Sequence, residues 1–320
     1  MKITAILFPF ILLALPSYGQ NRETDYLSHV LEKMNAVESV TYHCVIKAWE
    51  PGDKEPGYSV PIEIYEHVNP QDTAVGYSFL CASDKEFRQP LWVYDGTVFA
   101  YIEKEEKEVR IDDFTQKSPL PFRVIMPQAF GCMKSILEYA LNTQDSIVLS
   151  LKDEGKDYLM ELSIHTPYQV EFFGKACYMP QNPYIYDPTS IYKIWISKEN
   201  DMPYRYRREM QHSISENICS DFVYNPAGKG KIVAEDYYPA DYVRRIKGEK
   251  SQKATVDMTG KKAPDWTLTD MKGQKVSLSS IKSKVILLQF TGIGCGPCKI
   301  SIPFLNRLRK EYAVNELEVL

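Results

Sequence analysis

The sequence predicts an α+β domain, built on a curved antiparallel sheet or half-barrel with helices, followed by a shorter α/β unit. Three observations predict this organisation. Apolar residues alternate with polar ones at every second position in many segments of the first 245 residues. A polar, basic stretch follows, and after it comes an apolar run that leads into two closely spaced cysteines and an amphipathic segment. A chain of 320 residues has room for about two domains.

The composition is that of a globular protein. The chain is 44% hydrophobic and 25% charged, which is enough apolar material to bury a core. Its formal charge is −4, and no long basic stretch is present. We therefore expect no nucleic-acid partner.

Residues 1–19 have the pattern of a secretory signal peptide. Lys2 supplies the positive start, Ile3–Leu15 are largely apolar, and Pro16–Gly19 form a small-residue exit. An apolar helix of about 13 residues spans only ~20 Å of a ~30 Å hydrocarbon core, which argues against a membrane anchor. We expect cleavage after Gly19 and an exported protein that is periplasmic or associated with the cell envelope.

Residues 20–245 form the predicted strand-rich domain. Thr24 is expected to cap a first helix, and Val40–Ala48 alternate as in a half-buried strand. Asp95-Gly96 is a two-residue hairpin signal, and Met133–Leu141 suggest a second helix. Further strands are expected around Ile62–His67, Ala74–Cys81, Leu91–Tyr94, Thr97–Ile102, Glu108–Ile111, Tyr158–Ile164, Ile191–Ser197, Pro203–Glu209 and Ile214–Tyr224.

This layout resembles the lipoprotein-carrier half-barrels, in which a curved sheet holds acyl chains beneath a helical lid. The resembling stretches are Val93–Gly96 with the strand after them, and Ile191–Ser197 leading to Met202-Pro203. The resemblance implies that a lipid or lipoprotein binds to this domain. The alternative is that its tyrosines and Trp195 simply pack a core.

Residues 246–262 are predicted to be a linker, and residues 263–320 a second domain. Lys284–Phe290 are almost continuously apolar, as in a central strand that is covered on both faces. Cys295-Gly296-Pro297-Cys298 follow, and a helix is expected from there to about Tyr312. Its expected apolar face consists of Phe304, Leu305, Leu308 and Tyr312.

A strand that turns into a helix at a C-x-x-C pair places the first thiol at the helix N-terminus. Free N–H groups and the helix macrodipole favour a thiolate there, so we expect Cys295 to attack a substrate disulfide. Cys298, one turn along, can then resolve the mixed disulfide. Pro297 limits the backbone between them and needs no N–H in the first helical turn.

Cys295–Lys299 followed by Pro303 resembles the active-site helix of the thioredoxin superfamily. Ala263–Leu268 and Gly273–Leu278 resemble the opening hairpin of its TlpA/ResA-like branch. The resemblance implies a thioredoxin-like reductase of protein disulfides, with Gly296, Pro297 and Pro303 as supporting residues. It further implies an upstream thiol donor and a role in redox homeostasis.

No cofactor and no metal are expected at this motif. The chain has no second close cysteine pair to complete a zinc site. Lys299 stands where c-type haem attachment needs a histidine.

Three features depart from the thioredoxin pattern. Gly294 replaces the tryptophan that usually precedes the first cysteine, and Gln289 replaces a buried acid, so it cannot take a proton from Cys298. The sequence ends at Leu320, in what resembles the second core strand, before the cis-proline loop of the family. The segment is thus expected to be only the N-terminal part of such a domain, with weak turnover.

Two other functions stay open on the sequence. One is a non-enzymatic periplasmic lipid- or lipoprotein-binding protein with a vestigial redox segment. The other is a peroxiredoxin-like antioxidant of the AhpC/TSA type, although Gly292 stands where that site has threonine or serine. The pairing of the remaining five cysteines is also open, except that an odd set leaves at least one thiol free: Cys44, Cys81, Cys132, Cys177 and Cys219.

Overall fold

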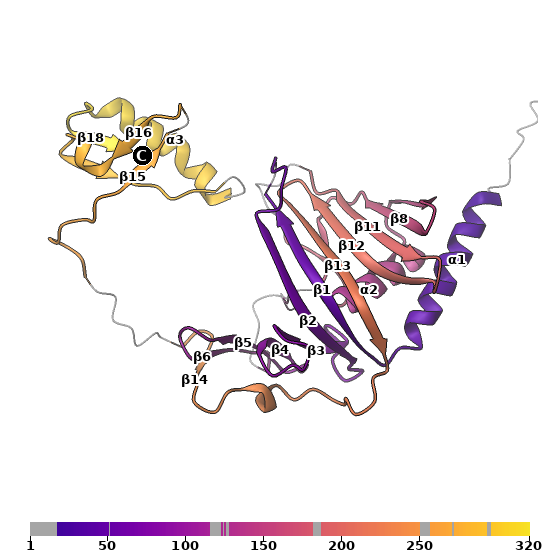
Figure 1. Ribbon diagram of the computed structural model, residues 1–320. Helices are drawn as coiled ribbons and strands as arrows, with labels where there is room; N and C mark the ends of the chain where they lie inside the picture. Colours follow the sequence, from indigo (N-terminus) through magenta and orange to yellow (C-terminus); the bar gives the residue numbers. More distant parts are fainter. Residues whose placement is uncertain are drawn as a thin grey trace, which may run out of the picture.

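The computed structural model describes residues 18–50, 52–115, 123, 125, 128–181, 187–249, 257–270, 272–292 and 296–320. It consists mostly of strands with few helices, and a large curved sheet dominates it (Figure 1). The predicted signal peptide lies almost entirely outside the described residues, so its cleavage stays a prediction. None of the helices described is long and apolar enough to cross a membrane.

The large sheet has 12 strands and joins both ends of the first 246 residues. All its neighbouring strands are antiparallel except β14 and β6, which are parallel. In spatial order the strands are β14 (Val243–Ile246), β6 (Glu108–Asp113), β5 (Val98–Glu103), β4 (Pro90–Tyr94), β3 (Tyr77–Ala82), β2 (Tyr58–Val68), β1 (Ser39–Trp49), β13 (Ser213–Tyr224), β12 (Met202–Met210), β11 (Ser190–Ser197), β8 (Asp157–Ile164) and β7 (Ile147–Asp153).

Side-chain alternation decides which face of each strand is buried. In β11 the side chains of Tyr192, Ile194 and Ile196 are buried, while Lys193 and Trp195 point to the other face. A strand with this period presents one apolar face, and the sheet buries it against helices. Every strand predicted in this domain is present, with small shifts of its ends.

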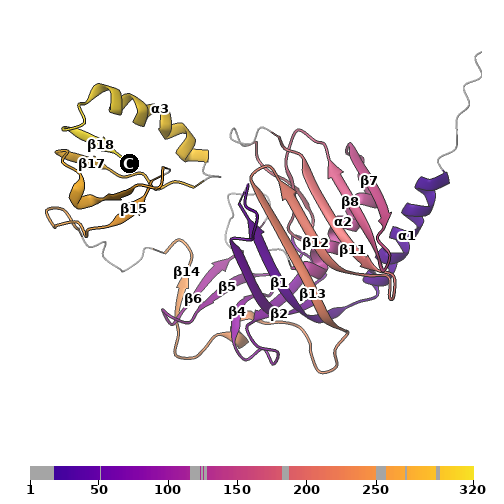
Figure 2. The same cartoon turned by 45° about the horizontal axis from the view of Figure 1, so that its top comes forward.

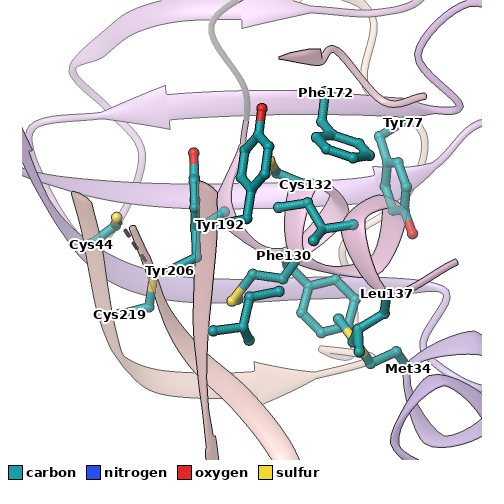
Figure 3. Close-up of a cluster of buried hydrophobic side chains, with 14 of the residues drawn as sticks. Met34, Cys44, Tyr77, Phe130, Cys132, Leu137, Phe172, Tyr192, Tyr206 and Cys219 are labelled. Carbon is teal, nitrogen blue, oxygen red and sulfur yellow. Dashed lines mark hydrogen bonds between the residues drawn. The ribbon is translucent and has the colours of Figure 1, made fainter. Parts of the chain in front are cut away.

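Two helices pack on the buried face. α2 (Ala129–Asn142) lies against it (Figure 2), and α1 (Tyr18–Asn35) packs against α2 and β12. Aromatic and sulfur-containing side chains fill the space between α2 and the strands (Figure 3). The largest fully buried residues are Tyr42, Tyr94, Tyr192, Phe79, Phe130 and Phe172.

A small cavity remains beside α2, lined among others by Glu66, Tyr77, Gln128 and Cys132. Its volume of about 20 Å³ suits a single water molecule, whereas ligand pockets typically measure ~300 Å³ or more. An acyl chain does not fit in this cavity. The lipid partner of this domain stays a prediction.

Three features of the first domain differ from expectation. Thr24 lies inside α1 and does not cap it, because Gln20–Glu23 contain no helix breaker and the helix begins at Tyr18. The β4–β5 reversal is centred on Gly96-Thr97, one residue later than expected, with the Asp95 N–H bonded to the Val98 carbonyl at 3.3 Å. Four short or weakly patterned strands were not predicted: β7, β14, β9 (Val170–Phe172) and β10 (Ala176–Tyr178).

The C-terminal residues form two small sheets and a helix. β15 (Thr267–Thr269) pairs with β16 (Lys275–Ser277) as an antiparallel hairpin, and β17 (Val285–Leu287) pairs in parallel with β18 (Leu317–Val319). Between the last two strands the chain forms α3 (Gly296–Glu311), which packs against β18. This strand–helix–strand order places the cysteine motif between β17 and α3. Two 3₁₀ turns complete the described elements, at Ala234–Tyr237 and Leu278–Ser280.

Candidate redox site

The strand that leads into the motif is short and largely open to solvent. β17 spans three residues, and backbone hydrogen bonds extend its pairing to Leu320, whose N–H bonds to the Leu287 carbonyl at 2.9 Å. The expected burial on both faces is wrong for this strand: Val285, Leu287 and Leu288 are exposed, and Phe290 is 90% exposed. The reason is that, within the described chain, β17 has a hydrogen-bonded neighbour only in β18.

Cys298 is half-buried in the first turn of α3 and is part of a disulfide bond. Its sulfur lies 4.0 Å from the carbonyl oxygen of Phe290, at the end of the apolar run. Cys295 lies outside the described residues, directly before the first residue of α3. Its role as the attacking thiol therefore stays a prediction.

A chain of hydrogen bonds joins the strand to the first turn of the helix. The Gln289 amide Nε2 donates to Ser301 Oγ at 2.7 Å, and Ser301 Oγ donates to the Cys298 carbonyl at 2.7 Å. Sequence reasoning did not single out Ser301, although its position three residues after Cys298 places it on the same helix face. These contacts fix the backbone at Cys298, and the Gln289 amide provides no group that accepts a thiol proton.

The packed side of α3 differs from the predicted one. Leu305 and Leu308 are half-buried, as expected, but Phe304 is 51% exposed and Tyr312 is 49% exposed. Among the α3 side chains that the structure describes after Cys298, the half-buried ones are Ser301, Leu305 and Leu308, whose spacing follows one narrow stripe of the helix. Ser301, a polar residue, thus lies on the packed side of the helix, where the apolar pattern predicted Phe304.

Pro303 lies inside α3, and the helix continues through it. Because proline has no N–H, the carbonyl of Lys299 lacks its usual intrahelical donor. Gly296 and Pro297 occupy the first turn, where a missing N–H costs nothing. The supporting roles assigned to Gly296, Pro297 and Pro303 stay predictions.

An open apolar cleft lies beside the end of the strand. Its volume is about 500 Å³, and the lining residues come from the hairpin and from the β17 and β18 ends. They include Trp266, Leu268, Val276, Leu288 and Phe290. Phe290 thus lines the cleft, and its carbonyl faces Cys298.

The five cysteines of the first domain are free thiols in this structure: Cys44, Cys81, Cys132, Cys177 and Cys219. All except Cys177 are buried. In the described parts of the chain, no three or more His, Cys, Asp or Glu side chains gather as a metal site would need.

Residues 259–320 match the AhpC/TSA family. The same segment is similar to the thiol-disulfide oxidoreductase ResA of Bacillus anthracis, with 36% identity over 61 residues. It is also similar to the thioredoxin-like protein YneN of Bacillus subtilis, with 40% identity over 63 residues.

These matches cover only part of this chain and only part of each relative. They cover 19% of this chain and 35% of ResA, and 20% of this chain and 37% of YneN. The chain thus spans little more than a third of the curated relatives it matches. The similarity supports a redox enzyme ancestry for this segment.

Solved structures resemble this chain only loosely. Lipoprotein LppX of Mycobacterium tuberculosis aligns with 65% of this chain and 98% of its own, at a TM-score of 0.34 and 8% identity. A LolA superfamily protein of Nitrosomonas europaea aligns with 68% of this chain and 99% of its own, at a TM-score of 0.26 and 11% identity. Scores this low do not bear on function.

Proposed function

We propose that residues 263–320 act as a thiol–disulfide oxidoreductase that reduces or exchanges disulfides of exported proteins through Cys295 and Cys298. The observation that carries this proposal is the disulfide-bonded Cys298 in the first turn of a helix that directly follows an apolar strand. The oxidoreductases that this segment resembles support it. The pattern of residues 1–19 supports a place outside the cytoplasm, in the periplasm or cell envelope.

The reaction is a pair of thiol–disulfide exchanges. The thiolate of Cys295 attacks one sulfur of the substrate disulfide, which releases the other sulfur as a thiolate and forms a mixed disulfide. The thiolate of Cys298 then attacks the Cys295 sulfur and releases the second substrate thiolate. The substrate gains two electrons, and the protein keeps the new disulfide until an external thiol donor reduces it.

The protein's own groups favour these steps without a dedicated acid. Backbone N–H groups at the start of α3 stabilise negative charge on the first sulfur. The Gln289–Ser301–Cys298 hydrogen bonds hold the backbone of the second cysteine in place at the start of α3. Because Gln289 is an amide, the thiol protons pass to water or to the leaving thiolates.

The apolar cleft provides a surface for the substrate chain. Phe290, at 90% exposure, is the most exposed large apolar side chain of the described residues, and it lies where the cleft meets the disulfide. We infer that it contacts the polypeptide next to the substrate disulfide. A small disulfide, which has no such polypeptide, would not need this contact.

Replacing Phe290 with serine should lower kcat/KM for insulin-disulfide reduction by roughly 10-fold, because an exposed aromatic anchor is lost. Turnover of hydroxyethyl disulfide by the same variant should be unchanged. Phe304→Ser is the matched control, since Phe304 is a large side chain that is 51% exposed on α3. Both assays use the full chain with dithiothreitol as the donor.

The outcomes separate the two parts of the proposal. Equal loss with insulin and with hydroxyethyl disulfide would show that Phe290 supports the site itself and does not contact substrate. Wild-type insulin reduction by Phe290→Ser would contradict the docking role. Absence of any activity above background in the unaltered chain would contradict the proposed function.

A further inference from the structure

Two of the buried thiols of the first domain face each other across the sheet. Cys44 on β1 and Cys219 on β13 are directly opposite in the strand register. Their sulfur atoms lie 3.5 Å apart, and the dashed line in Figure 3 marks this contact. Cys44 is fully buried and Cys219 is 4% exposed, so solvent has almost no access to either.

The backbone geometry at these positions suits a disulfide. Directly opposite residues of antiparallel strands have Cα atoms about 4.5–5.5 Å apart. Disulfides span Cα separations of about 4.4–6.8 Å, with a sulfur–sulfur bond of about 2.05 Å. The two sulfurs are already in contact at 3.5 Å, so closing the bond of about 2.05 Å requires them to approach by about 1.5 Å.

The other described thiols have different neighbours. Cys81 donates to Gln128 Oε1 at 3.1 Å, and Cys177 donates to the Lys175 carbonyl at 3.5 Å. Cys44 also donates to Asn217 Oδ1 at 3.5 Å, a contact that bond formation would release. Among these described thiols, Cys44 and Cys219 are the pair whose sulfur atoms contact each other.

We propose that Cys44 and Cys219 form a cross-strand disulfide, a second cysteine pair that is independent of the C-x-x-C motif. The two thiols together lose two electrons and two protons, and an external disulfide, small or protein-borne, takes them up and becomes two thiols. The balance is one bond formed between Cys44 Sγ and Cys219 Sγ and one disulfide bond broken in the oxidant.

The bond forms while the sheet is assembling. Burial is the main cause that raises the pKa of the Cys219 thiol well above its ordinary value, and the neighbouring Cys44 raises it further. A buried, protonated thiol is a poor nucleophile, so the folded Cys219 thiol reacts slowly. Before β1 and β13 pair, both thiols are open to water and to a disulfide reagent.

The position of the pair gives the bond a structural effect. In the strand order, the β1–β13 pair joins β14 and strands β1–β6 on one side to β13, β12, β11, β8 and β7 on the other. The two cysteines are 175 residues apart in the sequence, so a bond between them closes a very long loop. Closing such a loop restricts the unfolded chain strongly and raises the melting temperature.

The test uses the full chain with Cys295→Ser and Cys298→Ser, so that the C-terminal pair does not contribute. The protein is refolded with oxidised glutathione, alkylated under denaturing conditions with a light reagent, reduced, and alkylated again with a heavy one. Mass spectrometry should find heavy label on the peptides of Cys44 and Cys219, and light label on that of Cys81. A sample refolded with a reductant should melt on the order of 10 °C lower.

Two further variants make the result specific. In Cys44→Ala/Cys219→Ala, the oxidised and reduced samples should melt together, whereas Cys177→Ser should keep the full difference. Light label on Cys44 and Cys219 after oxidative refolding would overturn the proposal. So would heavy label that mass spectrometry traces to a bond of either residue with a different cysteine. The labelling is read on the parent chain, so it decides the matter even if the double variant does not fold.

Discussion

Cys295→Ser should reduce insulin-disulfide reduction by the full chain to the uncatalysed background, a loss of at least about 100-fold. The physical reason is that a serine hydroxyl is not ionised at neutral pH and does not form a disulfide. The substitution should not alter the fold, so the far-UV circular dichroism spectrum should not change. Cys177→Ser is a matched control, because Cys177 is a half-buried thiol far from the motif in the sequence.

Cys298→Ser should give a different result from Cys295→Ser. Without the resolving thiol, the first exchange still occurs and the mixed disulfide persists, so a stable adduct with substrate should accumulate. Non-reducing electrophoresis and mass spectrometry detect it. Equal insulin reduction by the wild type and Cys295→Ser would contradict the assignment of the attacking thiol, and adducts formed by Cys295→Ser in place of Cys298→Ser would reverse the two roles.

The second large effect is expected at Glu66, a carboxyl that is only 1% exposed. It lies on β2 and accepts hydrogen bonds from the backbone N–H groups of Phe130 and Gly131, each at 3.0 Å, at the start of α2. The Tyr42 hydroxyl also donates to it. Burial raises the pKa of Glu66 to about 7, although these hydrogen bonds oppose that shift.

This shift makes stability depend on pH with a defined sign. Between about pH 4.5 and 7 the folded protein keeps the Glu66 proton while the unfolded chain releases it. Folding is therefore favoured at low pH, and the contribution of Glu66 to the unfolding free energy falls as pH rises to about 7. A shift from 4.5 to about 7 corresponds to a loss of about 3 kcal/mol.

Glu66→Gln should remove this pH-dependent part, because the amide does not titrate. Urea unfolding from pH 4.5 to 8 should show the wild type losing about 3 kcal/mol relative to the variant. Nearby Tyr42 and Tyr77 do not interfere, since burial raises both of their pKa values and leaves them neutral throughout. Glu161→Gln, a partly exposed position on β8, is the control and should keep the wild-type dependence. Parallel curves for the wild type and Glu66→Gln would contradict the prediction.

Local patterns predicted much of this molecule. The alternation in Ile191–Ser197 predicted a half-buried strand and which of its side chains face the core, and β11 has that arrangement. The order of strand, C-x-x-C motif and helix could also be predicted, because it depends on residues that are close in the sequence. The supporting hydrogen bonds could not be predicted in this way. Ser301 links Gln289 to Cys298 only once the strand and the helix have folded against each other.

The sequence by itself determined the positions of most strands, the linker composition and the cysteine motif, because periodicity and spacing are properties of neighbouring residues. Tertiary structure alone decided that β1 pairs with β13, that Glu66 reaches the start of α2, and that Phe304 stays exposed. The alternation of apolar and polar residues shows which face of a strand is apolar. It does not show which other strand pairs with it. The partner is chosen by the packing of the whole sheet, which brings Cys44 and Cys219 into contact across 175 residues.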